Sequence, residues 1–254
     1  MARFKVGVQL HPQHTTVEDM RNAWREADRL GVDSIWTWDH FFPLYGGGGG
    51  AHFEGWSLLA AMAVDTERAD VGVLVTCNSY RNPDLLADMA RTVDHLSGGR
   101  VVLGIGAGWF QRDYHEYGYE FGTAASRLRD LEAALPRIRR RLGRLNPPPL
   151  GELPIMIGGG GERVTLRLVA EHARLWNTFG PPSSFAHKSR ILDQWCDRVG
   201  RDPAEIERTV LLDRHDDLDD LEAYLQAGAG HVIVGRSHPF DLGAVPALLE
   251  AARS

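Results

Sequence analysis

Short apolar runs alternate with longer amphipathic segments along the chain. The runs are rich in valine and isoleucine, and most lack an apolar–polar alternation, which is typical of strands buried on both faces of a parallel sheet. Eight runs are predicted as strands: Phe4–Leu10, Ser34–Trp38, Val71–Cys77, Val101–Ile105, Pro154–Ile157, Arg174–Thr178, Thr209–Leu212 and His231–Val234.

The segments between these runs carry apolar residues at intervals of three and four, which predicts helices. The clearest case runs from Val17 to Leu30 and is ended by Gly31. A second long helix is predicted over Leu128–Leu145, with Asn146-Pro-Pro-Pro149 ending it. Eight strand–helix units in 254 residues match a (β/α)8 TIM barrel in a single domain, 1–254. An open, doubly wound sheet is the alternative.

Composition narrows the classes of partner. The formal net charge is −6, which disfavours binding to nucleic acid or to an anionic membrane surface. Two cysteines, Cys77 and Cys196, are too few for a disulfide framework, and neither a charged-then-apolar leader nor a run of 18 apolar residues occurs. We therefore expect a soluble protein of a reducing cytoplasm that binds neither nucleic acid nor a membrane.

Two polar residues stand at the end of the second predicted strand. Asp39 and His40 directly follow the apolar Ser34–Trp38 run. Active sites of barrels lie at the carboxyl ends of the strands, and a buried strand end has no structural need for a carboxylate and an imidazole. We expect both residues in a functional site. The alternative is that Asp39 only caps a turn and His40 is an ordinary loop histidine.

Two glycine-rich loops follow the fourth and fifth predicted strands. Gly158–Gly161 precedes a helical pattern over Glu162–His172, so its amides could face outward at a helix amino terminus and bind an anion, most often a phosphate. Gly104-Ile-Gly-Ala-Gly108 would let a flat ring lie against bare backbone. Neither loop has the spacing of a P-loop or a dinucleotide fingerprint. Together they predict a phosphorylated planar cofactor; the alternative is two tight turns.

Two further features leave alternatives open. The five glycines Gly46–Gly50 lie over the predicted active face and form either a mobile lid or a slack loop. A metal-dependent barrel enzyme would need carboxylates and histidines from several strand ends. The candidate ligands are His11, His14, Asp39, His40 and His215. Because strands four, five and eight offer mainly glycine, we expect no metal.

The chain resembles the luciferase-like flavin and deazaflavin oxidoreductases, a family of (β/α)8 barrels, and is most similar to the branch that uses the deazaflavin coenzyme F420. The resemblance spans essentially the whole sequence. It is carried by Trp38-Asp-His-Phe41, Leu74-Val-Thr-Cys-Asn-Ser-Tyr-Arg-Asn-Pro83, Gly104-Ile-Gly-Ala-Gly-Trp109 with Tyr114-His-Glu-Tyr-Gly118, and Ile157-Gly-Gly-Gly-Gly-Glu162.

This resemblance implies roles for individual residues. His40 would face the substrate as the catalytic residue, and a non-prolyl cis peptide would fall near Val73 and Leu74. Asp39 would bind the cofactor head, and the loop after the fifth strand would bind its phosphate. The residues expected to contact the cofactor are Asp39, Val73, Leu74, Asn78, Gly106, Ala107, Gly108, Gly158, Gly159, Gly160, Gly161, Glu162, Arg163 and Thr178.

Two positions depart from the sugar-phosphate dehydrogenases of this family. Those enzymes carry a tryptophan shortly after the Asp-His pair and a glutamate after the fourth-strand glycines, whereas this chain has Leu44 and Trp109 there. The departures argue against sugar-phosphate oxidation and leave no second catalytic acid at that position.

The resemblance implies an oxidoreductase that transfers a hydride between F420 and a small organic substrate. One alternative is a monooxygenase that uses FMN supplied by a separate reductase, because both cofactors carry a phosphate. Another is a barrel that binds a flavin or deazaflavin without catalysis. A homodimer is compatible with each of these functions.

Overall fold

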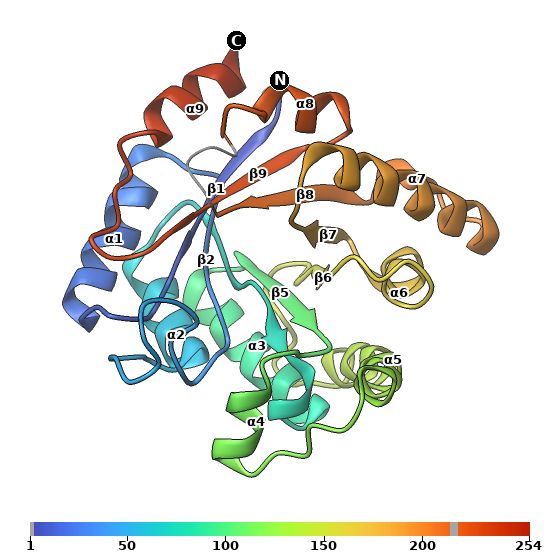
Figure 1. The fold of residues 1–254 in the computed structure, drawn as a ribbon. Helices are drawn as coiled ribbons and strands as arrows, with labels where there is room; N and C mark the ends of the chain where they lie inside the picture. Colours follow the sequence, from blue (N-terminus) through green and yellow to red (C-terminus); the bar gives the residue numbers. More distant parts are fainter. Residues whose placement is uncertain (1–2, 214–217) are drawn as a thin grey trace.

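The computed structural model describes residues 3–213 and 218–254 and contains a closed barrel of parallel strands with helices outside it (Figure 1). The strands are β1 Lys5–Leu10, β2 Ser34–Thr37, β3 Asp70–Val73, β4 Thr76–Cys77, β5 Val101–Gly106, β6 Ile155–Gly158, β7 Leu175–Thr178, β8 Glu207–Leu212 and β9 His231–Arg236. The α-helices are α1 Val17–Leu30, α2 Gly55–Asp65, α3 Pro83–Ser97, α4 Gln111–Tyr117, α5 Ala124–Leu142, α6 Thr165–His172, α7 Pro182–Val199, α8 Leu221–Gln226 and α9 Val245–Arg253.

The strand order confirms the predicted (β/α)8 barrel. Neighbouring strands follow the order β3-β2-β1-β9-β8-β7-β6-β5-β4, and β3 also pairs with β5. This last pairing, through Val71 opposite Val101, closes the sheet and excludes the open doubly wound alternative. β3 and β4 are two parts of one barrel position, because the predicted strand Val71–Cys77 is interrupted between Val73 and Thr76.

The helix predictions hold with two differences. α1 has the predicted bounds, and Gly31 ends it in the left-handed conformation that glycine favours. α5 begins at Ala124 and ends at Leu142 rather than Leu145. α6 begins at Thr165 rather than at Glu162, because the amide of Leu166 donates to the carbonyl of Gly161 and closes a wider turn first. The predicted position of the glycine loop directly at a helix start is therefore wrong by three residues.

Two of the three hydrophobic clusters in the described part of the chain build the barrel, and the third consists of Cys77, Tyr80 and Tyr114 beside the segment after β4. A large outer cluster joins the strands to the helices that cover them. A smaller cluster consists of strand residues and the bulge between β3 and β4, so it fills the inside of the barrel: Trp36, Leu74, Val102, Met156, Leu175 and Ile233. Large side chains inside the barrel are typical of this fold and make it a packed core rather than a pore. No helix in the described part of the chain is long and apolar enough to cross a membrane.

A polar cluster lies at the amino ends of the strands, opposite the expected active face. His231 Nδ1 is 2.8 Å from Glu207 Oε1, and His231 Nε2 is 2.8 Å from the hydroxyl of Ser34. Lys5 donates to the second oxygen of Glu207 at 2.8 Å. Burial raises the pKa of Glu207, but the hydrogen bonds and charges of His231 and Lys5 outweigh it and bring the pKa to about 2.

Acid is expected to weaken the fold through Glu207. A carboxyl whose pKa is lower in the folded than in the unfolded state stabilises the fold above its unfolded pKa, near 4.5. That stabilisation, about 1–3 kcal/mol for hydrogen bonds to a charged group, is lost as the pH falls toward about 2. Urea unfolding should show Glu207→Gln less stable than wild type at neutral pH, with the difference closing in acid.

The matched control is Glu250→Gln on α9, which removes an exposed carboxylate that has no ionic partner among the described residues. Its stability should follow that of wild type at every pH. A difference between Glu207→Gln and wild type that stays constant down to about pH 2 would contradict the assignment.

Candidate active site

His40 follows β2 and is held by a carboxylate from α4. His40 Nδ1 lies 2.7 Å from Oδ2 of Asp113, whose side chain is fully buried. The Asp113 carboxylate also accepts hydrogen bonds from the Tyr80 hydroxyl at 3.0 Å and from the Phe41 amide at 3.1 Å. Because an ionised carboxylate only accepts, we assign the proton of the neutral ring to Nδ1, which leaves Nε2 as an acceptor.

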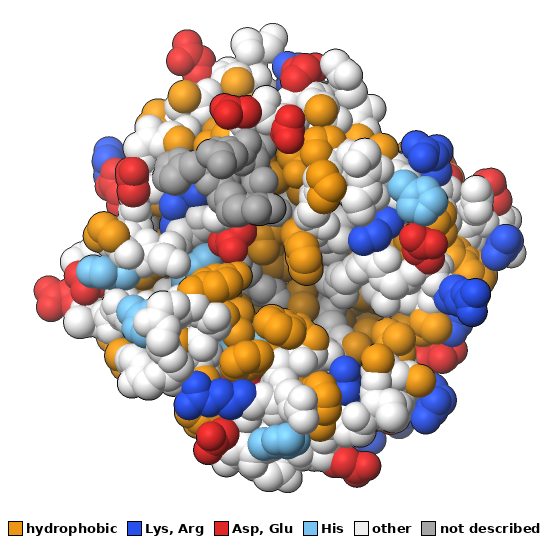
Figure 2. Space-filling model, viewed as in Figure 1, with side chains coloured by type: hydrophobic (Ala, Val, Ile, Leu, Met, Phe, Trp, Pro, Cys, Tyr) orange, Lys and Arg blue, Asp and Glu red, His pale blue; other side chains and the backbone are white. Residues whose placement is uncertain are grey.

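Aromatic rings surround the imidazole of His40. The rings of Trp38, Trp109 and Phe110 stand nearly perpendicular to it, with centroid distances of 5.9, 5.7 and 5.5 Å. Trp109 is 63% exposed. On the face of the molecule drawn in Figure 2, hydrophobic side chains surround a central hollow. The His40 side chain is 14% exposed, and its Nε2 has no hydrogen-bond partner among the described residues. The arrangement can therefore exchange a proton with a small molecule in an apolar setting.

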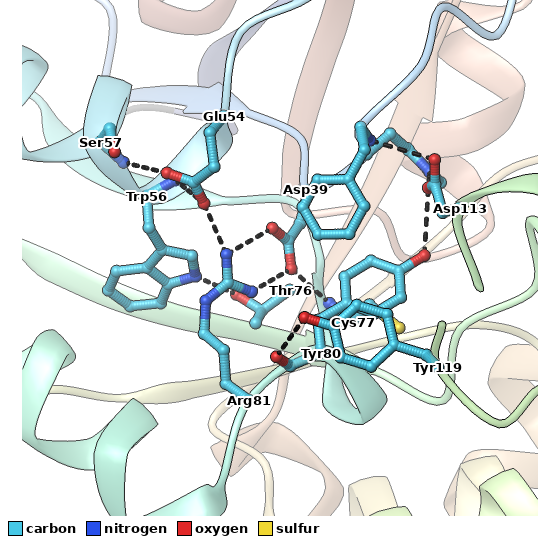
Figure 3. A network of polar contacts seen from close by, with 12 residues as sticks. Asp39, Glu54, Trp56, Ser57, Thr76, Cys77, Tyr80, Arg81, Asp113 and Tyr119 are labelled. Carbon is cyan, nitrogen blue, oxygen red and sulfur yellow. Dashed lines mark hydrogen bonds and ion pairs between the residues drawn. The ribbon is translucent and has the colours of Figure 1, made fainter. Parts of the chain in front are cut away.

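Asp39, the neighbour of His40, points into the protein (Figure 3). Arg81 donates to both of its oxygens, at 2.6 and 2.9 Å, and the amide of Cys77 donates to Oδ2 at 2.9 Å. Arg81 also donates to Oε1 of Glu54 at 2.5 Å. Both oxygens of Asp39 thus serve to tie β2 to the segment after β4, and the contact of Asp39 with a cofactor stays a prediction.

The predicted cis peptide lies in the expected region, one residue further along the chain. It joins Leu74 to Val75, between β3 and β4. The carbonyl of Leu74 accepts a hydrogen bond from Gln9 Nε2 at 2.6 Å, which fixes this bulge to β1. The bulge lies at the carboxyl end of its strand, next to the chain segment that carries Asp39 and His40.

The glycines of β5 have a structural reason that the sequence did not reveal. A Cβ atom on Gly104 would lie 2.1 Å from the carbonyl oxygen of Val73, and one on Gly106 would lie 2.8 Å from a methyl of Val75. Gly158 at the end of β6 meets the same Val75 side chain at 2.8 Å. These three glycines make room for the bulge. The sequence had instead predicted that Gly104 and Gly106 lack side chains so that a flat ring can lie against their backbone.

The turn after β5 is packed in the same way. Gly108 has a φ of +82°, and a Cβ there would lie 2.0 Å from the Tyr114 hydroxyl and 2.6 Å from the Cys77 sulfur. The hydroxyl of Tyr114 is 3.4 Å from the carbonyl of Ala107.

Asn78 is buried, and its Oδ1 has no hydrogen-bond partner. Asn78 therefore keeps a free acceptor beside the bulge, as a ligand-binding residue would.

The loop Gly158–Gly161 has the features of an anion site. The amide of Gly159 donates to the carbonyl of Asn177 at 2.9 Å, whereas the amides of Gly160 and Gly161 donate to no acceptor in the described part of the chain. Two unpaired amides in succession fit a phosphate oxygen. Of the other predicted contacts nearby, Glu162 lies 3.2 Å from His187, Arg163 is exposed, and Thr178 is buried at the end of β7.

The metal hypothesis finds no support in the described residues, which contain no group of three or more candidate ligands. Asp39 is bound to Arg81, and His40 to Asp113. His11 stacks on Trp38 with a centroid distance of 4.3 Å. His215, the fifth candidate ligand, lies outside the described residues.

The glycine run Gly46–Gly50 wraps around a histidine. His14 Nε2 is 2.8 Å from the carbonyl of Tyr45, and a Cβ on Gly50 would lie 2.0 Å from His14 Nδ1. A Cβ on Gly48 would lie 2.2 Å from Arg112, which donates to the carbonyl of Gly48 at 2.8 Å. The Tyr45 hydroxyl donates to Asp213 at the end of β8 at 3.1 Å. His14 and Arg112 therefore fix Gly48 and Gly50, whereas a Cβ on Gly47 or Gly49 would meet nothing within 4 Å, and the choice between a lid and a slack loop stays open.

Two residues of the site were not predicted from the sequence. The sequence predicted no second acid, because Trp109 stands where related enzymes carry a glutamate. In the structure Asp113 supplies a carboxylate beside His40, and Arg81 neutralises Asp39. Both stand in or beside segments that carry the resemblance: Arg81 is inside Leu74–Pro83, and Asp113 directly precedes Tyr114. The charge of each residue beside a motif was a signal that the sequence offered. The sequence offered no signal that Asp113 would pair with His40, which lies 73 positions away.

Comparison with known proteins places the chain in a family. The family described as luciferase-like monooxygenase matches residues 1–232. The F420-dependent glucose-6-phosphate dehydrogenase of Amycolatopsis mediterranei is 32% identical over 138 residues, which cover 53% of this chain and 40% of that protein. The 4-hydroxyprotoasukamycin monooxygenase of Streptomyces nodosus subsp. asukaensis is 28% identical over 244 residues, 83% of this chain and 62% of that protein.

A solved structure shows the same fold. The F420-dependent secondary alcohol dehydrogenase in complex with an F420-acetone adduct superposes with a TM-score of 0.86, at 17% identity, over 99% of both chains. The two curated relatives named above are longer than this chain, which spans 40% of the first and 62% of the second.

Proposed function

The chain belongs to the luciferase-like monooxygenase family, and on that premise we propose that it is an oxidoreductase transferring a hydride between coenzyme F420 and a small organic substrate. The observation that carries the proposal is the His40–Asp113 pair, which leaves an unpartnered imidazole nitrogen at the barrel mouth beside the bulge. The identity to an F420-dependent dehydrogenase over about half of the chain supports the choice of cofactor.

Each part of the site has a role in this function. F420 would supply the hydride chemistry when bound, with its phosphate on the loop Gly158–Gly161 and its ring beside Leu74–Val75. His40 Nε2 accepts a proton from a substrate hydroxyl, or returns it to a carbonyl oxygen, while Asp113 holds the ring and stabilises its charged form. The rings of Trp38, Trp109 and Phe110 give the imidazole an apolar surrounding.

Cofactor binding tests the proposal directly. Titration of the purified protein with F420, followed by the fluorescence of the deazaflavin, should give saturable binding in the micromolar range or tighter. Competition with FMN decides between the two cofactors. The proposal fails if F420 does not saturate and FMN does, or if neither ligand binds.

The second candidate is an FMN-dependent monooxygenase, which the relation to 4-hydroxyprotoasukamycin monooxygenase supports. In that case a separate reductase would deliver reduced flavin, and oxygen consumption would accompany turnover. A homodimer and a cytoplasmic location stay predictions that gel filtration and cell fractionation can test.

A further inference from the structure

The loop Gly158–Gly161 is crossed by two side chains that the described site does not use. A Cβ on Gly160 would lie 2.5 Å from Nζ of Lys188, and one on Gly161 would lie 2.8 Å from Oγ1 of Thr165. Lys188 is on α7 and Thr165 is the first residue of α6, so both approach the loop from outside the barrel. The missing Cβ atoms of the two glycines give these side chains their positions.

Both side chains lack a partner. No carboxylate of the described residues pairs with Lys188, although its neighbour His187 is 3.2 Å from Glu162. Thr165 is only 6% exposed, yet its hydroxyl makes no hydrogen bond with the described chain. A phosphate on the loop can accept from both donors, and it would give the Lys188 ammonium a counter-charge.

We propose that Lys188 and Thr165 are the specificity-determining side chains of a phosphate-ester site on this loop. The Lys188 ammonium, the Thr165 hydroxyl and the amides of Gly160 and Gly161 are all donors, and a phosphate offers only acceptors. Lys188 supplies the one full charge of this group. The inference rests on the proposed function, because the ligand is the phosphate of the cofactor tail: a phosphodiester in F420 or a phosphomonoester in FMN.

Cofactor titrations measure the contribution of the tail. Lys188→Gln should weaken F420 and FMN binding by about 10- to 100-fold, as for the loss of a charge-assisted hydrogen bond. Binding of riboflavin and of the deazaflavin chromophore without its tail should stay within about twofold. Arg190→Gln is the matched control on α7, since Arg190 is exposed and has no partner among the described residues.

A double-mutant cycle tests the geometry. Gly160→Ala puts a methyl group where Lys188 lies and should weaken F420 binding about as much as Lys188→Gln does. Combining the two should add little, because each removes the same contact. Thr165→Val should give a smaller, several-fold loss. Full additivity of Gly160→Ala and Lys188→Gln, or equal losses for tailed and tail-less ligands, would overturn the proposal.

A readout without cofactor separates this inference from the proposed function. The chain has two lysines, Lys5 and Lys188, and Lys5 is paired with Glu207. Inorganic phosphate should protect Lys188, but not Lys5, from a lysine-selective acylating reagent, as read by peptide mass spectrometry. Protection without F420 or FMN binding would keep the site and refute the proposed function. F420 binding that Lys188→Gln leaves unchanged, with no protection, would refute the site alone.

Discussion

Replacing Arg81 with methionine is expected to lower the free energy of unfolding by about 3–5 kcal/mol, the cost of leaving one partner of a buried ion pair alone. Arg81 donates to both oxygens of Asp39 and to Glu54, and the Asp39 side chain has no exposed surface. Urea unfolding followed by circular dichroism measures the loss. Far-ultraviolet spectra before unfolding show whether the variant still folds.

The pH dependence of this loss gives a second readout. Burial raises the pKa of Asp39, and the charge and hydrogen bonds of Arg81 oppose that rise. Without Arg81 the carboxyl should take up a proton more readily in the folded state. A carboxyl whose pKa is higher in the folded than in the unfolded state destabilises the fold most at a pH above the folded pKa. The loss of unfolding free energy in Arg81→Met should therefore shrink as the pH falls from about 7 to about 4.

Two control variants sharpen the test. Arg137→Met removes an ion pair between Arg137 and Asp84, and both side chains are 41% exposed. It should lower the free energy of unfolding by less than about 1 kcal/mol. Adding Asp39→Asn to Arg81→Met removes the unpaired charge and should restore part of the stability. A loss in Arg81→Met no larger than that in Arg137→Met would refute the role of the buried pair.

Replacing His40 with glutamine is expected to lower turnover by about 10²–10⁴-fold, the usual contribution of a general acid or base. The affinity for F420 should stay close to that of wild type, because the phosphate loop and the bulge are untouched. The measurement uses the alcohol or ketone that wild-type protein turns over fastest in a screen, followed by F420 absorbance. His95→Gln, on α3 and bonded to the carbonyl of Pro148, is the control.

Asp113 acts through His40 and is therefore a positioning residue. Asp113→Asn should lower turnover less than His40→Gln and should leave F420 affinity unchanged, since the ring is still present but loses the carboxylate that holds it. Turnover that survives His40→Gln would remove His40 from the chemistry. If F420 binds and no substrate is turned over by wild-type protein, the non-catalytic alternative gains.

Strand and helix positions followed from local patterns in the sequence. Buried parallel strands need short, continuous apolar runs, and covering helices need apolar residues every three or four positions, so the alternation of the two patterns indicated a barrel. Strand ends then indicated where a site would lie, and His40 was predicted on that basis. These features depend on residues that are close together in the chain.

The pairings within the site were decided by the tertiary structure alone. Asp113 reaches His40 from 73 positions away, and Arg81 reaches Asp39 from 42. The side chains that cross Gly160 and Gly161 arrive from two separate helices. The sequence by itself determined the barrel, and it predicted the face on which a site would lie and the part that His40 and the glycine loops play in it. Which carboxylate holds His40, and what fills the space over each glycine, depended on contacts that no local pattern encodes, because closing the barrel brings together residues far apart in the chain.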